Sequence, residues 1–523
     1  MKKFISGVLI LLLGCIMVCS FTSCKDKTFY ETLDTADNLV NISSGTIYQT
    51  MEGFGASSAW WSQVVGGNDN ADEIVKYLYS SEGLGLNIYR YNIGGGSVDK
   101  KDVYSYYEDE RMCESFLKGE NYTGSTHDEL LAYVSNENNY DFTKDKNAMN
   151  VLKKSLSYGC IDSLVLFVNS PHYLMTKNNL CHSTTPSTDN LAEENYDVFA
   201  AYLMQILKYF VVDNNYPVTY ISPINEPQWK WGGSDASQEG CHFEPASAAK
   251  CLNEIYIQLK AFNEKYSKNI KLDAYESGGY PANYNTDYLE QMSKYDYFKE
   301  LDHISYHAYK SPTSRSIRET TLEKLAKYNI SFSQSEYCQL SSGVSNTFET
   351  AQYLGYVMCY DIGILHSNTW QWWIAVSNYN YEDGLLYNNW DEKNPEVKVA
   401  PRYYMMKHYS KFVQEGAQYI QVNPLNEKSY LTDLDKVKKW YKNGDEDAVF
   451  ADDLYNVFKN PDGSIVIVYI NITDYEYEWN IKDQYETYAK YTSTDENYLQ
   501  ETSGKFNGQI KFEPNSITTI VLK

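Results

Sequence analysis

The stretch "SPINEPQWKW", residues 222–231, places an Asn, a Glu and a Pro in succession, after one proline and before two tryptophans. A β-rich run, Val218-Thr-Tyr-Ile221, leads directly into it. We therefore predict a buried strand that ends at Glu226. Pro227 favours an extended backbone at the residue before it, so the carboxylate should continue the direction of the strand. An acidic residue at a strand end can also simply face solvent, and the rest of the chain decides between these readings.

β-rich runs and helical patterns alternate on both sides of this stretch. Residues 196–210, for example, place apolar side chains at three- and four-residue spacing, which is typical of an amphipathic helix. Strands that alternate with helices favour a parallel sheet, and eight such units predict an α/β fold of the (β/α)8 TIM-barrel type over residues 48–405. The eight β-rich runs are residues 50–57, 86–93, 163–170, 218–225, 271–277, 303–309, 330–337 and 368–373.

The chain after the predicted barrel has a different pattern. Residues 465–471, 475–481 and 517–522 are β-rich, and turn signals such as Pro461-Asp-Gly463 separate them. We therefore expect residues 406–523 to form an all-β domain. Residues 24–47 are expected to supply a linker and one further strand to that domain.

The N-terminus, "MKKFISGVLILLLGCIMVCSFTSCKDK", has the pattern of an export signal. A basic start is followed by an apolar stretch over residues 4–18, so we expect residues 1–23 to be a signal peptide. Phe21-Thr-Ser-Cys24, followed by polar residues, resembles the lipobox of bacterial lipoproteins. The prediction is lipidation at Cys24 and an exported protein anchored at the cell surface or membrane. Signal cleavage without a lipid is the alternative. No other stretch reaches the ~18 apolar residues of a membrane span.

Composition narrows the class of partner. The chain has 523 residues, a formal net charge of -24 and 15% aromatic residues, with 51 Tyr and 10 Trp. Aromatic faces stack on sugars and on bases alike, but this charge would repel a phosphate backbone. We therefore expect a polysaccharide or oligosaccharide partner and no nucleic acid. The cysteine spacings match no zinc pattern, and we predict neither a metal nor a cofactor. The sequence leaves the oligomeric state open.

The ends of the eight predicted strands carry the candidate site. In a barrel the C-terminal ends of the strands face the mouth, where active sites lie. Every one of these ends is polar, titratable or aromatic. In chain order, the candidates are Trp60, Trp61, Arg90, Asn169, Asn225, Glu226, Trp229, Glu276, His307, Tyr309, Glu336, Trp370 and Trp372.

Two carboxylates on opposite strands suggest a reaction class. Glu226 ends the fourth predicted strand and Glu336 the seventh, nearly across the mouth from each other. Glycoside hydrolysis needs such a pair: one acid protonates the leaving oxygen, while the other carboxylate attacks or activates water. The carboxyl groups are about 5–5.5 Å apart in retaining enzymes and about 6.5–9.5 Å apart in inverting ones. Glu276 is interpreted as a structural or substrate-bonding residue.

Four motifs together resemble glycoside hydrolase family 30. They are "GFGASSAWW" (residues 53–61), "LNIYRYNIGGG" (86–96), "NEP" (225–227) and "SEY" (335–337). The resemblance implies a retaining barrel with a β-sandwich side domain built from both chain ends. By the same resemblance, Glu226 would be the acid/base and Glu336 the nucleophile. Within the family the first two motifs are most similar to the endo-β-1,6-galactanase branch.

The remaining candidates receive roles around this pair. Arg90 is expected to keep Glu336 ionised, and Asn225 to bind the sugar 2-hydroxyl. Asn169 is expected to bind the substrate, and His307 and Tyr309 are expected to contact the sugar or the nucleophile. Candidate stacking platforms are Trp60, Trp61, Trp229, Trp370 and Trp372.

Other functions stay open at this point. The alternatives within the family are a β-1,6-glucanase, a xylanase and an exo-acting fucosidase or galactosidase. A non-catalytic glycan-binding surface lipoprotein on the same barrel is a further alternative. The presence of both glutamates favours an enzyme. A thiol hydrolase built on Cys338 lacks a supporting His–Asn pattern.

Overall fold

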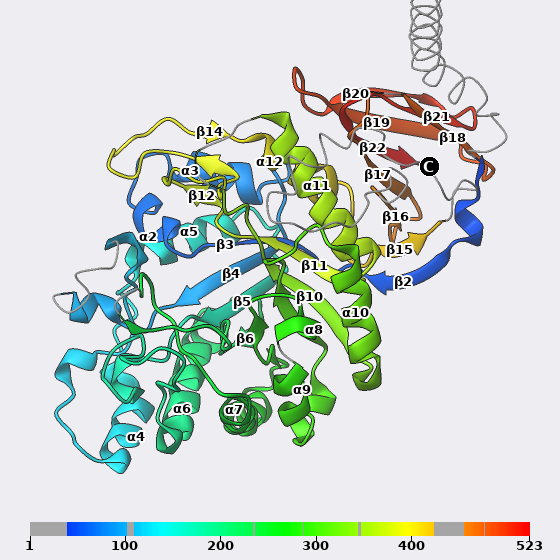
Figure 1. Cartoon of the computed structure of the whole chain (residues 1–523). Helices are drawn as coiled ribbons and strands as arrows, with labels where there is room; N and C mark the ends of the chain where they lie inside the picture. Colours follow the sequence, from blue (N-terminus) through cyan, green and yellow to red (C-terminus); the bar gives the residue numbers. More distant parts are fainter. Residues whose placement is uncertain are drawn as a thin grey trace, which may run out of the picture.

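The computed structural model describes residues 39–101, 109–233, 236–284, 286–341, 343, 347–422, 454–474 and 476–523. The predicted signal peptide and Cys24 lie outside these residues. Figure 1 shows a barrel with helices around it and a smaller β domain beside it. Among the described residues, no helix combines the length and apolar character that crossing a membrane requires.

The barrel sheet is parallel throughout. Its strands follow the order β7-β6-β5-β4-β3-β11-β10-β9-β8. The outermost two, β7 and β8, are halves of the single predicted strand 271–277, interrupted at residues 273–275, so the sheet closes on itself. This confirms the predicted barrel fold. The strands are β3 (Gly53–Ser57), β4 (Ile88–Ile93), β5 (Ser163–Val168), β6 (Val218–Ser222), β7 (Lys271–Leu272), β8 (Glu276–Ser277), β9 (His303–His307), β10 (Ser331–Glu336) and β11 (Ser367–Trp372).

Helices cover the outside of the barrel, so its strands are buried on both faces, as β4 is along its whole length. Local signals define several helix starts: Thr126 and Glu129 form a capping box at α4, and α7 and α12 begin with proline. The helices are α2 (Trp61–Val65), α3 (Ala71–Tyr79), α4 (His127–Ser135), α5 (Lys146–Leu156), α6 (Tyr196–Leu207), α7 (Pro245–Tyr266), α8 (Pro281–Tyr284), α9 (Thr286–Met292), α10 (Arg315–Leu325), α11 (Phe348–Gly363) and α12 (Pro401–Ser410).

The β domain is a sandwich that both ends of the chain build. A seven-stranded sheet has the order β2-β15-β16-β17-β22-β19-β20, and a three-stranded sheet has the order β1-β18-β21. Side chains such as Ile467, Trp479 and Phe512 form an apolar core of this domain. Its strands are β1 (Leu39–Val40), β2 (Thr46–Thr50), β15 (Gln418–Gln421), β16 (Tyr455–Lys459), β17 (Ile465–Asn471), β18 (Tyr477–Ile481), β19 (Thr487–Ser493), β20 (Gln500–Lys505), β21 (Gln509–Phe512) and β22 (Ser516–Leu522).

The β domain packs against the end of the barrel opposite the mouth. Met51, just before β3, exchanges backbone hydrogen bonds of 2.8 Å with Gly416 and Ala417, just before β15. On α12 the buried His408 ring lies within 2.8 Å of the Thr519 and Ser493 hydroxyls of the seven-stranded sheet. Burial lowers the pKa of His408 to about 3, so this contact is made by a neutral ring. The arrangement leaves the mouth of the barrel uncovered by the β domain.

A third, small sheet lies beside the mouth. It consists of β12 (Val376–Ser377), β13 (Leu386–Tyr387) and β14 (Lys398–Val399), in the chain between β11 and α12. The segment from the end of β11 to the start of β13 supplies Trp373, Tyr379, Tyr381 and Asp383 to the cleft described below.

Candidate active site

Glu226 lies in a turn beyond its strand. β6 ends at Ser222, and Glu226 has a φ of 45°, in the left-handed region. The predicted extended backbone at this residue is therefore wrong. Hydrogen bonds hold the turn despite the preference imposed by Pro227: the Glu226 N–H donates to the Glu276 carbonyl at 2.8 Å, and its carbonyl accepts from the Trp231 indole at 2.8 Å. The turn places the carboxylate in the cleft, 2.8 Å from His307.

Glu336 is the last residue of β10, and both of its oxygens have a partner. Arg90 of β4 donates from Nη1 to Oε2 at 2.8 Å, and the Tyr309 hydroxyl donates to Oε1 at 3.2 Å. The Arg90 guanidinium is completely buried and lies 3.6 Å from the centre of the Phe167 ring. These contacts fix the orientation of the Glu336 carboxylate.

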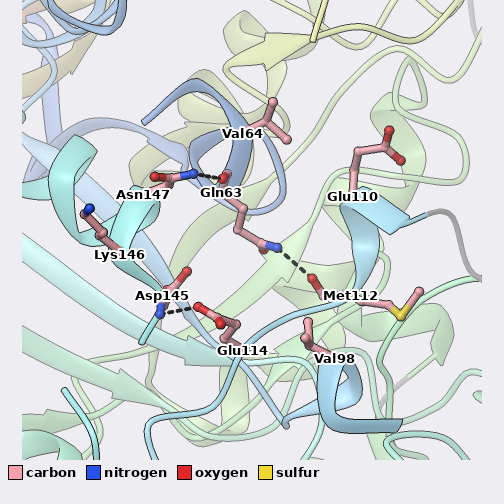
Figure 2. A pocket seen from close by; sticks show the side chains of 9 residues that line it. All are labelled: Gln63, Val64, Val98, Glu110, Met112, Glu114, Asp145, Lys146 and Asn147. Carbon is pink, nitrogen blue, oxygen red and sulfur yellow. Dashed lines mark hydrogen bonds between the residues drawn. The ribbon is translucent and has the colours of Figure 1, made fainter. Parts of the chain in front are cut away.

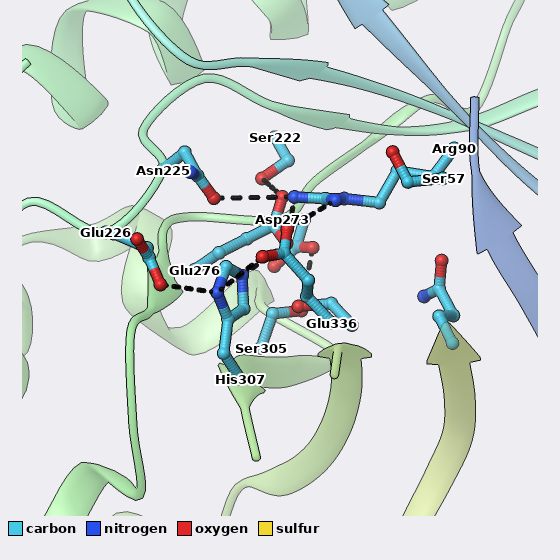
Figure 3. A network of polar contacts seen from close by, with 12 residues as sticks. Ser57, Arg90, Ser222, Asn225, Glu226, Asp273, Glu276, Ser305, His307 and Glu336 are labelled. Carbon is cyan, nitrogen blue, oxygen red and sulfur yellow. Dashed lines mark hydrogen bonds and ion pairs between the residues drawn. The ribbon is translucent and has the colours of Figure 1, made fainter. Parts of the chain in front are cut away.

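His307, the last residue of β9, stands between three carboxylates (Figure 3). Its Nδ1 lies 2.8 Å from Oε1 of Glu226 and 3.4 Å from Oε1 of Glu336. Its Nε2 lies 3.2 Å from Oε2 of Glu276. A carboxylate oxygen of Glu226 and one of Glu336 lie within 4.8 Å of each other. Strand ends that are distant in the sequence thus form one charged network.

Charge in this network shifts several pKa values. Burial lowers the pKa of His307, but Glu336 and Glu226 outweigh it and raise the pKa to about 10. Burial raises the pKa of Glu276, but Arg90 and His307 outweigh it and lower the pKa to about 2. Near neutral pH His307 is therefore an imidazolium, and Glu276 is ionised.

The pKa of Glu336 moves in the opposite direction from that of Glu276. Burial raises it, the charges of Glu226 and Glu276 add to the rise, and His307 and Arg90 oppose it without cancelling it. Arg90 therefore favours the ionised form of Glu336, as expected, but it does not offset the effect of burial. The charge of Glu226, across the same imidazolium, thus makes ionisation of Glu336 less favourable.

Three residues of the network could offer ligand atoms to a metal. Atoms of Glu226, His307 and Glu336 lie within 4.8 Å of one another. A metal-binding histidine must be neutral, with a lone pair on the ligating nitrogen. A metal at this place would therefore have to displace a proton from His307, whose two ring nitrogens both face carboxylates.

An open cleft of about 530 Å³ lies above both glutamates. The predicted residues Trp60, Asn169, Asn225, Trp229 and Tyr309 line it together with Glu226 and Glu336. The Asn225 amide donates to Asn169 at 3.0 Å, and its oxygen lies 3.4 Å from Arg90. Asn225 is thereby oriented beside the two carboxylates.

Three of the predicted stacking tryptophans do not reach the cleft. Trp61, Trp370 and Trp372 are fully buried, so their prediction as sugar-stacking residues is wrong. The alternation of side chains along β11 directs Trp370 and Trp372 to the same face. Each indole N–H is satisfied inside the protein: Trp61 by the Ser57 carbonyl, Trp370 by Asp361 of α11, and Trp372 by the Asp383 carbonyl.

Arg90 and His307 are also fully buried and are not part of the cleft surface. Arg90 contacts Glu336 at 2.8 Å and His307 lies 3.4 Å from it, so the expected contacts with the predicted nucleophile are present. Only a direct contact of these two residues with the sugar is wrong, because both lie beneath the carboxylates as positioning residues.

A further group of residues lines the cleft without having been predicted from the strand ends. Nearly all of them lie on loops, where no periodic pattern indicates which way a side chain points. Trp373 is the exception. It directly follows the last residue of β11, and this position at a strand end is a signal that the sequence contains. Arg111 stands between two rings, 4.9 Å from that of Trp60 and 5.1 Å from that of Tyr379. The missed residues are Arg111, Trp231, Gln238, Gly278, Lys310, Cys338, Leu340, Trp373, Tyr379, Tyr381 and Asp383.

A second hollow, of about 420 Å³, lies between α2 and α5 and shares no lining residue with the cleft (Figure 2). Its amide groups bond within the protein: Gln63 donates to the Met112 carbonyl at 2.6 Å, and Asn147 to the Gln63 carbonyl at 2.7 Å. Glu114 accepts from the Asp145 backbone at 2.5 Å. The facing carboxylates Glu226 and Glu336 line the cleft together with aromatic residues, so the cleft is the candidate active site.

Comparison with known proteins agrees with this geometry. The family model described as O-Glycosyl hydrolase family 30 matches residues 37–387, more than half of the chain. The chain belongs to glycoside hydrolase family 30. A second model, the Glycosyl hydrolase family 30 beta sandwich domain, matches residues 448–520. The family resemblance inferred from the motifs is confirmed, and this family 30 chain is a glycosidase.

Individual relatives of this family 30 chain are distant. An endo-β-1,6-galactanase from Hypocrea rufa is 23% identical over 418 residues, which are 75% of this chain and 78% of the relative. A conserved exported protein from Bacteroides fragilis has a TM-score of 0.76 at 22% identity, covering 92% of this chain and 100% of that one. The catalytic domain of xylanase C from Talaromyces cellulolyticus has a TM-score of 0.66 at 17% identity, covering 93% and 99%. The two structural likenesses show the fold.

Proposed function

We propose that the protein is a retaining endo-β-1,6-galactanase, with Glu336 as nucleophile and Glu226 as acid/base. The observation that carries the mechanism is the gap of at most 4.8 Å between oxygens of the two carboxylates. Retaining enzymes hold their carboxyl groups about 5–5.5 Å apart, whereas inverting enzymes need about 6.5–9.5 Å to admit a water molecule. The short gap favours direct attack by one carboxylate.

The contacts of each glutamate support its role. A nucleophile must attack along one direction, and Arg90 and Tyr309 hold Glu336 by both oxygens. An acid must release a proton and then carry a negative charge. The imidazolium of His307, 2.8 Å from Glu226, stabilises the carboxylate that remains after this transfer.

The reaction has two steps. In the first, Glu336 attacks the anomeric carbon, the bond to the leaving oxygen breaks, and Glu226 gives its proton to that oxygen. In the second, Glu226 takes a proton from water as the water attacks the same carbon, and the ester bond to Glu336 breaks. Two displacements at one carbon retain its configuration. Asn225, oriented by Asn169, lies where it can bond the sugar 2-hydroxyl.

The choice of substrate rests on the galactanase relative, on the sequence motifs and on the shape of the cleft. A 1,6-linkage adds a rotatable bond between rings, so the cleft must order a flexible chain. Aromatic residues stand on both sides of the glutamates: Trp60 and Trp373 follow the adjacent strands β3 and β11, and Trp229 follows β6 across the barrel. Each stacking contact contributes on the order of 1 kcal/mol, by analogy with aromatic pairs.

Hydrolysis of defined polysaccharides tests this proposal. The mature chain should release short galacto-oligosaccharides from debranched arabinogalactan, and nothing from glucuronoxylan or β-1,6-glucan. NMR spectra taken in the first minutes should show the β-anomer as the first product, because both displacements occur at the same carbon.

Each result that contradicts the proposal identifies a different error. Products from glucan or xylan alone would overturn the substrate. Galactose as the sole early product would overturn endo action. An α-anomer as first product would overturn the retaining mechanism. Binding of galactan without any product would favour a glycan-binding surface protein.

We further propose that the chain is exported and held at the membrane by a lipid on Cys24. The basic start, the apolar stretch and the polar residues after the cysteine support it. Cys24→Ala should move the protein from the membrane fraction to the soluble fraction, while Cys15→Ala should leave its distribution unchanged. One acyl chain binds membranes only marginally, so stable retention requires several chains. An intact mass without a lipid adduct would contradict the proposal.

A further inference from the structure

A third carboxylate lies beneath the catalytic pair. Glu276, the first residue of β8, is fully buried and does not line the cleft, so it has no access to substrate. Its Oε1 accepts a hydrogen bond of 2.8 Å from the Ser222 hydroxyl. Its Oε2 lies 2.9 Å from Nη2 of Arg90 and 3.2 Å from Nε2 of His307. One carboxylate oxygen thus joins both cations of the network.

Each of these cations also contacts a catalytic carboxylate through another of its nitrogens. Arg90 uses Nη1 to bond Glu336 at 2.8 Å, and His307 uses Nδ1 to contact Glu226 at 2.8 Å. The main chain adds a third connection, because the Glu226 N–H donates to the Glu276 carbonyl. Figure 3 shows Glu276 between Arg90 and His307, with Glu226 and Glu336 on the same network. Glu276 is therefore linked to both catalytic glutamates through rigid, buried groups.

The charges in this network also have a chemical consequence. Arg90 and His307 supply two positive charges, and Glu226, Glu276 and Glu336 supply three negative charges when all are ionised. One added proton makes the group neutral, and a double displacement begins with one proton on its catalytic pair. Without the charge of Glu276, the two cations would balance two ionised catalytic carboxylates, and the pair would lose its proton more easily.

We propose that Glu276 is a positioning residue that orients Arg90 and His307 and, by its negative charge, keeps one proton on the Glu226–Glu336 pair. This role rests on the proposed function of these two glutamates, but it is independent of the sugar that the cleft accepts.

Other ionisable groups around the network do not supply the same charge. Burial raises the pKa values of Tyr309 and Cys338 well above their usual range, so both stay neutral. Asp273, between β7 and β8, has other partners: it accepts a hydrogen bond of 2.7 Å from Ser305 and lies 3.8 Å from His303. Besides the catalytic pair, Glu276 is the carboxylate that contacts Arg90 and His307 among the described residues.

Comparison of Glu276→Gln with Glu276→Asp tests this proposal. The amide keeps the shape and removes the charge. A neighbouring negative charge raises the pKa of an acid, so its removal should shift both limbs of the kcat/KM–pH profile to lower pH by about one unit or more. kcat at neutral pH should fall roughly 10²-fold, the loss that misplaced catalytic groups cause, with little change in KM. Glu276→Asp keeps the charge but shortens the side chain. Its activity should therefore fall, while both limbs of the kcat/KM–pH profile stay at the wild-type pH.

Two further measurements keep the test decisive if Glu276→Gln does not fold. In the wild type, the ¹⁵N shifts of the His307 ring, assigned by their loss in His307→Gln, should be those of an imidazolium at pH 8. Ser222→Ala, which removes one hydrogen bond and no charge, should lower kcat several-fold with unmoved limbs. A neutral His307 ring at pH 8, or a folded Glu276→Gln variant that loses activity equally at every pH, would overturn the proposal.

Failure of the proposed function can be distinguished from failure of the proposed role of Glu276. If the substrate is not galactan, the pH profile can be measured on whichever glycoside is hydrolysed. If the roles of Glu226 and Glu336 are wrong, their own variants show it, whatever Glu276→Gln does.

Discussion

Glu336→Ala is expected to abolish turnover of every glycoside, with kcat/KM lower by on the order of 10⁴-fold or more, the scale on which loss of a covalent nucleophile acts in other hydrolases. Without this carboxylate no glycosyl-enzyme ester can form, so even an aryl glycoside with an activated leaving group should not react. Steady-state kinetics on galactan and on a dinitrophenyl β-galactoside measure the loss. The methyl side chain also leaves space for a small anion beside Arg90.

Azide distinguishes loss of the nucleophile from general damage. In Glu336→Ala, azide can attack the anomeric carbon in place of the carboxylate, with departure of the aryl group. A single displacement inverts the carbon, so the product should be the α-glycosyl azide. Glu319→Ala is a matched control: Glu319 lies on α10 with its side chain 54% exposed, and its activity should stay within about twofold of wild type. Substantial galactan hydrolysis by Glu336→Ala would show that another group is the nucleophile.

The barrel could be predicted because its signals are local. Each strand and helix has its own periodic pattern, and the alternation of the two dictates a parallel sheet whatever the loops do. The interruption in the fifth strand, at residues 273–275, leaves the two parts in line, so the prediction of one strand gave the same topology. Strand ends also identified Glu226 and Glu336, since parallel strands bring their carboxyl ends to one mouth.

The face of the strand to which each side chain points could not be predicted in the same way. Barrel strands are buried on both faces, so a buried aromatic residue can point to the axis or to the helices. Trp370 and Trp372 point to the same side of β11, and Trp370 meets Asp361 of α11. Trp373, one residue later, lines the cleft. The burial of Arg90 and His307 depends on how eight strands converge, and no single segment encodes that.

The left-handed turn at Glu226 had no clear signal either. A residue before proline normally avoids the helical region, so the local rule pointed to extended backbone. Tertiary hydrogen bonds from Glu276 and Trp231 outweigh that preference. Such a conflict between local preference and observed backbone is common at functional sites, where surrounding contacts sustain strain.

Glu226→Ala should have an effect that depends on the leaving group. Galactan needs a proton on its departing oxygen, so kcat should fall roughly 10²- to 10⁴-fold, the usual contribution of a general acid. A dinitrophenyl β-galactoside departs without a proton, so its first step should stay close to the wild-type rate. The second step should become slow, because no base activates water, and the covalent intermediate on Glu336 should accumulate as a burst of released phenol.

The azide product and the pH profile distinguish Glu226→Ala from a variant that lacks the nucleophile. Azide needs no base, so it should intercept the intermediate, accelerate turnover and give the β-glycosyl azide by two inversions at one carbon. The alkaline limb of the pH profile reports loss of the proton that the acid donates. With the dinitrophenyl substrate and azide present, that limb should therefore disappear in Glu226→Ala, since rising pH removes a proton the reaction no longer uses. An α-azide product, or an alkaline limb unchanged from wild type, would show that the acid is a residue other than Glu226. The turn that holds the Glu226 carboxylate 2.8 Å from His307 would then have a different role.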